Sequence, residues 1–394
     1  IVTHGGKAKE NYEELRNEEF TFVALLKTCA KKKDLHEGTR LHALIREKWP
    51  LEKNSYLATT LISMYAVCGL IGKAQELHDE LPIKSVDSWN ALISGYSRQG
   101  KGRSALDCFE HMESNGFSPD EVTFICVLKV CGSMRSIIEG KKIHNRIVSR
   151  GLLETNVKLG TALVDMYVKC GLHIKAQEVH DQLCVRDSVS WSVLITGYAH
   201  SGQGHEALCC FEHMQLEGLS PDAVTFTCIL KVCGSLGAIH IGTQIHDAIV
   251  RGGLLEKDIM LSTALVDMYA KCGLLIKAKQ VHDELRVRSV VSWSALIAGY
   301  TRQRQGHEAL HCFEQMQREG HSPDAITWIS VLAACGSIRD LKIGEQIHDE
   351  IASRGLLERD IDLGSALVDM YVQCSVLAKA QQIHDKLPIR SIAS

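Results

Sequence analysis

The sequence has no run of about 20 apolar residues, the length that a membrane-spanning helix needs, so we expect no such helix. It has no excess of positive charge either, because 44 Lys and Arg face 47 Asp and Glu, which gives a formal net charge of −3. A nucleic-acid partner usually leaves a basic footprint, so such a partner would need the basic residues gathered on one face. The chain begins at Ile1 without a charged-then-apolar leader, and we expect any targeting peptide to be left out of it.

A C-x-x-C pair is also absent, although the chain has fifteen cysteines. The odd number and the missing pair argue against a disulfide framework and against zinc sites. The cysteines instead recur at equivalent positions, in three sets: Cys29, Cys131, Cys233 and Cys335; Cys68, Cys170, Cys272 and Cys374; and Cys108, Cys210 and Cys312. We expect small buried side chains with free thiols, and therefore a reducing compartment.

The sequence repeats with a period of 102 residues, which separates Trp89, Trp191 and Trp293. Each period divides into three related modules of 31, 35 and 36 residues. A period of this kind is typical of stacked repeats rather than of separate globular domains.

The spacing of apolar residues in each module predicts two helices joined by a glycine-containing turn. In the module that begins at Val86, one helical face carries Trp89, Leu92, Ile93 and Tyr96, and a second stripe carries Ala105, Leu106, Phe109 and Met112. Neither helix can bury its stripe alone, so neighbouring hairpins must stack. We therefore predict an all-α protein, an α-solenoid with one continuous core and a concave groove.

The motifs distinguish between families of helical hairpins. The tetratricopeptide pattern W-x2-L-G-x2-Y is missing. Segment Ser85–Asp120, with SWNALISGY, resembles the P motif of the PLS class of pentatricopeptide repeat (PPR) proteins of land-plant organelles. Glu121–Asn156 resembles the L motif and Val157–Asp187 the S motif of that class. The resemblance implies a right-handed superhelix of stacked helix-turn-helix repeats over essentially the whole chain.

In this register, residues 1–18 are the second half of a preceding repeat and residues 392–394 open another. Eleven modules lie between them: L 19–54, S 55–85, P 86–120, L 121–156, S 157–187, P 188–222, L 223–258, S 259–289, P 290–324, L 325–360 and S 361–391. The S modules depart from the family at one place, where an aromatic residue is replaced by His78, His180, His282 and His384. We expect these histidines to soften the packing of the second helix without touching RNA.

The resemblance implies that single-stranded RNA is bound at one base per module, read by the fifth and the last residue. An Asp in the last place only accepts hydrogen bonds, so it favours guanine or uracil, which offer an imino N–H. Asn can also donate, which suits adenine or cytosine. A short Thr or Ser in the fifth place leaves room for a purine, whereas Asn goes with a pyrimidine.

These rules give a base for most modules. The pairs are Thr59 with Ser85 and Thr263 with Ser289 for adenine, Asn90 with Asp120 for uracil, and Thr161 with Asp187, Ser192 with Asp222 and Ser294 with Asp324 for guanine. Ser365 with Ser391 is ambiguous, with adenine as one reading. Among the L modules, Val23, Ile125 and Ile329 cannot bond a base, while Thr227 with Asp258 is an exception that suits guanine. Since the family binds RNA parallel to the chain, we predict a target containing 5′-AUnGGnAG-3′.

Two further sets of residues are expected to hold the RNA. The second residue of a module would sandwich the bases, as Val122, Val189, Val224 and Val291 suggest. Basic residues recur at two positions of the first helix: Arg98, Lys169, Lys271 and Arg302, and Lys27, Lys129 and Lys231. Recurrence favours a basic stripe that contacts phosphates, the alternative being solvated charges, and such a stripe predicts a steep salt dependence.

The resemblance also implies the targeting module of an organellar C-to-U RNA editing factor, in a mitochondrion or chloroplast, with editing-complex proteins as further partners. Deaminase zinc chemistry needs H-x-E and a later P-C-x-x-C. H-x-E begins at His78, His282 and His348, but no C-x-x-C follows, so we expect no enzyme, cofactor or metal site in this chain. The alternative function is a protein-binding α-solenoid scaffold, which would not distinguish the predicted RNA from a scrambled one.

Overall fold

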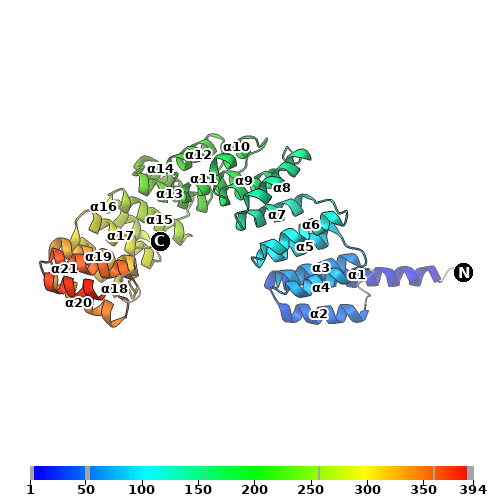
Figure 1. The fold of residues 1–394 in the computed structure, drawn as a ribbon, viewed down its shortest axis with the longest axis horizontal. Helices are drawn as coiled ribbons and strands as arrows, with labels where there is room; N and C mark the ends of the chain where they lie inside the picture. The colour runs from blue at the N-terminus through cyan, green and yellow to red at the C-terminus, as the bar shows by residue number, and fades with distance from the viewer. Residues whose placement is uncertain (1–3, 49–53, 155, 256–257, 358–359, 388–394) are drawn as a thin grey trace. The chain divides into compact units, whose positions relative to one another are not determined.

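The computed structural model describes residues 4–48, 54–154, 156–255, 258–357 and 360–387, with side chains from Glu18 onward. Within these residues the secondary structure consists of 22 helices without a strand (Figure 1). The chain forms two compact units, Ile1–Gly197 and Tyr198–Ser394. Among the described helices, none combines the length and the apolar character that crossing a membrane requires.

The helices of the first unit are α1 (His4–Lys32), α2 (Leu35–Lys48), α3 (Ser55–Val67), α4 (Ile71–Glu80), α5 (Val86–Arg98), α6 (Gly102–Ser114), α7 (Glu121–Ser133), α8 (Ile137–Ser149), α9 (Val157–Lys169) and α10 (His173–Asp181). The boundary between the units falls inside α11 (Ser188–His200). The second unit continues with α12 (Gly204–Leu216), α13 (Ala223–Leu236), α14 (Ile239–Arg251), α15 (Ile259–Lys271), α16 (Leu275–Glu284), α17 (Val290–Arg302), α18 (Gly306–Arg318), α19 (Ala325–Ile338), α20 (Leu341–Ser353), α21 (Ile361–Gln373) and α22 (Leu377–Lys386).

The module that begins at Val86 shows how the sequence builds a hairpin. A capping box opens α5, because Ser85 and Ser88 each accept a hydrogen bond from the other's backbone N–H. The predicted stripes are confirmed: the side chains of both stripes are buried except Tyr96, which is half-buried. Gly100 ends the first helix with a φ of +70°, a left-handed conformation that glycine adopts without strain.

Within each unit, the first helices of successive hairpins pack on one another. In the first unit α1 contacts α3, α3 contacts α5, α5 contacts α7 and α7 contacts α9. In the second unit the same succession runs from α13 through α15, α17 and α19 to α21. The second helices α2, α4, α6, α8, α14, α16, α18 and α20 each contact their own first helix and the first helix that follows, as α6 does with α5 and α7. The predicted all-α repeat solenoid is confirmed.

The N-terminal segment differs from the expectation. We expected residues 1–18 to belong to a separate preceding repeat, but α1 is one continuous helix from His4 to Lys32. The reason lies in the sequence, because residues 7–19 contain neither glycine nor proline and are rich in Glu, Lys, Ala and Leu, which favour helix. From α3 onward, ten first helices begin at the residues where we placed the module starts. The division into L, S and P modules stays a prediction.

The cysteines have free thiols, as predicted. The sets that contain Cys131 and Cys108 are buried, whereas the set that contains Cys68 is half-buried. Burial raises the pKa of Cys131, Cys233 and Cys335 to about 12. These thiols therefore stay protonated and unreactive at neutral pH.

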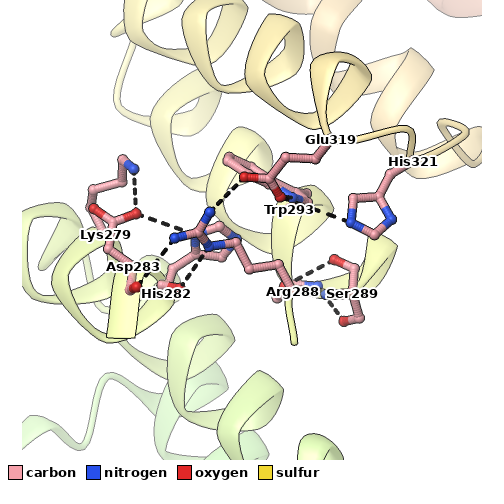
Figure 2. A network of polar contacts seen from close by, with 9 residues as sticks. Lys279, His282, Asp283, Arg288, Ser289, Trp293, Glu319 and His321 are labelled. Carbon is pink, nitrogen blue, oxygen red and sulfur yellow. Dashed lines mark hydrogen bonds and ion pairs between the residues drawn. The ribbon is translucent and has the colours of Figure 1, made fainter. Parts of the chain in front are cut away.

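Three of the histidines that we expected in place of an aromatic residue lie where the predicted S and P modules meet. His78, His180 and His282 are fully buried, and their rings lie 4.1–4.3 Å from the rings of Trp89, Trp191 and Trp293. Figure 2 shows this junction at His282. Arg288 donates there to the carboxylate of Glu319 in the next hairpin and to the backbone carbonyl groups of His282 and Asp283 at the end of α16. The imidazole thus fills the place of an aromatic ring.

A second histidine set, at the contact between L and S modules, also serves in packing between helices. His144, His246 and His348 place Nδ1 within 2.7–2.9 Å of the hydroxyl groups of Tyr167, Tyr269 and Tyr371. These three histidines therefore take part in packing between helices.

Candidate nucleic-acid interface

The last residue of a module has a structural role as well as its predicted reading role, because it caps the first helix of the next module. Asp120, Asp222 and Asp324 cap α7, α13 and α19, each accepting the backbone N–H of the third helical residue. Ser85 and Ser289 cap α5 and α17 in the same way. A capping side chain is held at the helix N-terminus, so the predicted reader has a fixed position.

The predicted uracil reader is a hydrogen-bonded pair. Asn90 lies on α5, and its Nδ2 donates to Asp120 Oδ1 over 3.1 Å. Burial works to raise the pKa of Asp120, but hydrogen bonds from the Thr123 backbone, the Thr123 hydroxyl and the Asn90 amide lower it overall. The carboxylate is therefore ionised at neutral pH and acts only as an acceptor.

Three other predicted pairs are brought together. Ser294 Oγ lies 3.2 Å from Asp324 Oδ1. The hydroxyl oxygens of Thr59 and Ser85 are 3.5 Å apart, and those of Thr263 and Ser289 are 3.4 Å apart. The fifth and last residues thus meet at one point of each of these modules.

Two further pairs, Thr161 with Asp187 and Thr227 with Asp258, show no direct contact among the described residues. Thr161 Oγ1 donates to its own helix at Val157, while Asp187 Oδ1 caps α11 through the N–H of Ser190. Thr227 likewise donates to the backbone of Ala223. Three other predicted reading residues are held by their local backbone. Ser192 donates to the carbonyl of Ser188, and Ser365 donates to that of Ile361. Asp222 caps α13. Ser391 lies outside the described residues.

A cavity of about 560 Å³ in the first unit is lined by predicted base-reading, base-sandwiching and phosphate-contacting residues. It opens between α1, α3, α5 and α7 and is lined by side chains that include Lys27, Tyr56, Thr59, Ser85, Asn90 and Val122. Reading residues of two predicted pairs, one predicted sandwich residue and one predicted basic residue therefore line the same cavity.

The predicted sandwich residues are exposed, although they are apolar. Val122, Val189, Val224 and Val291 have exposed fractions of 53–60%. The structure adds four residues at the same second position that we did not predict, namely Phe20, Tyr56, Met260 and Ile326, with exposed fractions of 52–66%. Counting two residues into every module would have found them. Three modules depart from this pattern, since their second residues are Asp87, Lys158 and Asp362.

The predicted phosphate contacts fall into two groups. All of them are exposed on first helices, but Lys169 and Lys271 form ion pairs with Asp165 and Asp267, at 2.6 and 2.7 Å. Lys27 donates to the hydroxyl group of Tyr56 over 3.2 Å. Within the part of the chain that the structure describes, no ion pair engages Arg98, Lys129, Lys231 or Arg302. An unpaired cation keeps its full charge for a phosphate, so these four are the stronger candidates.

The H-x-E sequences do not form a catalytic constellation. His78 and His282 are buried against tryptophan rings, and His348 contacts Tyr371. In the described segments, no group of three His, Cys, Asp or Glu side chains is placed to hold a metal ion.

Family models match the chain at regular intervals. The PPR repeat family model matches residues 84–133, 186–235 and 288–337, and the PPR repeat model matches residues 56–86, 161–187 and 262–290. Together these matches cover more than half of the chain.

Curated relatives and solved structures agree with these matches. A chloroplastic pentatricopeptide repeat-containing protein of Arabidopsis thaliana is 34% identical over 95% of this chain and 60% of its own length. A mitochondrial one from the same plant is 31% identical over 95% of this chain and 67% of its own length. The chain thus corresponds to about two thirds of these relatives or less.

The crystal structure of the maize pentatricopeptide repeat protein PPR10 shares the fold, with a TM-score of 0.69 at 19% identity over 93% of this chain and 58% of that one. The same protein in complex with an 18-nucleotide psaJ RNA element gives a TM-score of 0.70 over 95% of this chain and 60% of that one. The repeat matches, the relatives and the shared fold show that this chain belongs to the pentatricopeptide repeat family.

Proposed function

We propose that this chain binds single-stranded RNA sequence-specifically, one base per module, as the targeting part of a PLS-class organellar C-to-U editing factor. The observation that carries the proposal is the pairing of the fifth residue with the last one beside exposed apolar side chains, seen most completely around Asn90 and Asp120. The complex of PPR10 with an RNA element supports RNA as the ligand class. The chloroplastic and mitochondrial relatives support an organellar location.

The two best-formed pairs present different chemistry to a base. Asn90 uses one N–H on Asp120 and keeps the second, so this pair offers a donor and an acceptor, which match a carbonyl and the imino N–H of uracil. Ser294 is engaged with its own helix and with Asp324, so that pair offers a carboxylate acceptor. The adjacent N1–H and N2–H of guanine suit this acceptor. The target 5′-AUnGGnAG-3′ follows when all modules are read in this way.

Replacing Asn90 with Thr tests the register of the code. Asn90→Thr removes the amide donor and frees space for a purine, so the preferred base at the second target position should change from uracil to guanine. We expect the ratio of the two dissociation constants to change by about tenfold or more, in line with the ~1–3 kcal/mol that a good base contact contributes. Fluorescence polarisation with RNAs that differ only at this base measures the ratio.

Asn115→Thr is the matched control, because it makes the same chemical change at the end of α6, where the side-chain amide of Asn115 donates to the backbone of His111. This variant should keep the uracil preference. An unchanged preference in Asn90→Thr would exclude the proposed register. Equal binding of the target and a scrambled RNA by the unmodified chain would favour the protein-binding scaffold.

The unpaired basic residues predict a second result. With four or more phosphate contacts, the logarithm of the association constant should fall against the logarithm of salt concentration with a slope of about −3 or steeper. Lys231→Ala should reduce the steepness by about 0.7 and weaken all RNA sequences equally. Lys342→Ala, an exposed lysine on the second helix α20, is the control and should leave the slope unchanged. A slope unaffected by Lys231→Ala would contradict a role in phosphate binding.

A further inference from the structure

A buried hydroxyl group recurs at the third residue of the predicted P and L modules from Val86 onward, whereas Thr21 of the first L module is exposed. The buried members are Ser88, Thr123, Ser190, Thr225, Ser292 and Thr327, and all of them have an exposed fraction of 0%. A buried hydroxyl needs a hydrogen-bond partner, so each one shows what it is placed to hold. None can touch RNA directly, because none is accessible to solvent.

At the junctions from a P to an L module, this hydroxyl contacts both reading residues of the preceding module. Thr123 Oγ1 lies 2.7 Å from Asn90 Oδ1 and 2.8 Å from Asp120 Oδ1. Thr327 Oγ1 lies 2.6 Å from both Ser294 Oγ and Asp324 Oδ1. The fifth residue, the last residue and the next module's third residue therefore form one network.

This network leaves the carboxylate one orientation. Asp324 Oδ1 is surrounded by three donor groups, the Thr327 N–H at 2.8 Å, the Thr327 hydroxyl and the Ser294 hydroxyl. Asp120 Oδ1 is engaged in the same way by Thr123 and Asn90. The hydrogen bonds of the described residues to the Asp324 carboxylate all go to Oδ1, so its Oδ2 is the acceptor left for a base. The Asp120 carboxylate additionally accepts the backbone N–H of Val122. An acceptor fixed in direction distinguishes bases better than one that rotates.

The junction from an L to an S module lacks this arrangement. The third residue there is Leu57, Leu159, Leu261 or Leu363, which is buried and apolar. Among the described residues, Asp258 Oδ1 accepts hydrogen bonds from the N–H groups of Met260 and Leu261 alone, and Thr227 donates to its own helix. The predicted pair of Thr227 and Asp258 is therefore not joined through a third side chain.

We propose that Thr123 and Thr327 are positioning residues of the base-reading site, which fix the reading pair of the module before them. The inference rests on the proposed RNA binding and extends the site from two residues to three. Thr225 makes the same contact with Asp222, at 2.7 Å, and belongs to the same set. The pair of Thr227 and Asp258, without such a hydroxyl, distinguishes bases poorly.

The test uses the whole chain and the RNA 5′-AUUGGUAG-3′, whose last base faces Ser294 and Asp324, together with the three RNAs that carry another last base. Thr327→Val keeps the shape and removes the hydroxyl, whereas Thr327→Ser keeps the hydroxyl. We expect Thr327→Val to lower the preference for guanine at the last position by about tenfold, and Thr327→Ser to stay within about twofold of the unmodified chain. The preference at the second position should not change in either variant.

Asp340→Ala is the matched control for stability, because it removes a cap from the second helix α20 without touching a reading pair. It should leave all base preferences intact. A preserved guanine preference in Thr327→Val, or a loss of affinity equal for all four bases, overturns the inference alone. An unmodified chain without base preference at the last position overturns the proposed function and the inference with it. If Thr327→Val does not fold, Thr123→Val gives the same test at the second base.

Discussion

Lowering the pH from 7.5 to 4.5 is expected to remove about 5 kcal/mol of folding free energy through His78 and His282 alone. Both rings are fully buried, and burial lowers their pKa from 6.5 to about 4. The charged groups facing them are Lys84 and Asp79 at His78, and Lys279, Arg288 and Asp283 at His282. Below pH 6.5 the unfolded chain takes up protons that the folded chain does not, so stability falls until the pH reaches about 4.

The double variant His78→Phe with His282→Phe isolates this effect. Phenylalanine keeps an aromatic ring against Trp89 and Trp293 and cannot take up a proton. Urea unfolding followed by circular dichroism at the two pH values should show a loss smaller by about 5 kcal/mol than in the unmodified chain. His384→Phe is the matched control, because the His384 side chain is 70% exposed and solvated before and after unfolding. An equal acid loss in the double variant and the unmodified chain would contradict the prediction.

Trp293→Ala is expected to lower the free energy of unfolding by about 3–5 kcal/mol, as truncations of large buried aromatic residues do. The Trp293 side chain is 1% exposed, and its ring lies 4.1 Å from the ring of His282 (Figure 2). Its Nε1 donates to Glu319 Oε2 over 3.3 Å. Truncation opens a cavity between two modules and leaves His282 without the ring on which it packs.

Two further variants serve as comparisons, with the free energy of unfolding of all three measured by urea unfolding at neutral pH. Trp293→Phe keeps a ring and loses the bond to Glu319, so it should cost about 1 kcal/mol. Leu216→Ala truncates an apolar side chain that is 82% exposed, and should change stability by no more than about 0.5 kcal/mol. A loss in Trp293→Ala no larger than in Leu216→Ala would mean that this junction does not contribute to folding.

Periodicity was enough to predict the fold, because burial in a stack of hairpins depends on apolar spacing that the sequence displays directly. Trp89, Leu92 and Ile93 are buried as their spacing indicates. The continuous α1 was not predicted, since the resemblance placed a module boundary where the local residues favour helix.

The site was harder to predict, because its contacts join residues of different modules. The pairing of Asn90 with Asp120 follows from the family register. The role of Thr123 depends instead on the short distance between its hydroxyl group, in the first turn of α7, and the Asn90 amide on α5. The neutralisation of Lys169 by Asp165 could have been read from their spacing of four residues on one helix. The exposure of Tyr56 and Met260 needed only the module count.

The capping role of Asp120 has a consequence for building new specificities from these modules. A module cut at its own ends and moved to another array would carry its fifth and last residues but leave behind the threonine that holds them. The natural unit of exchange is therefore shifted along the chain, from the fourth residue of one module to the third residue of the next. Chimaeras joined at that place should inherit a complete reader, whereas those joined at the module boundary inherit one whose carboxylate depends on its new neighbour.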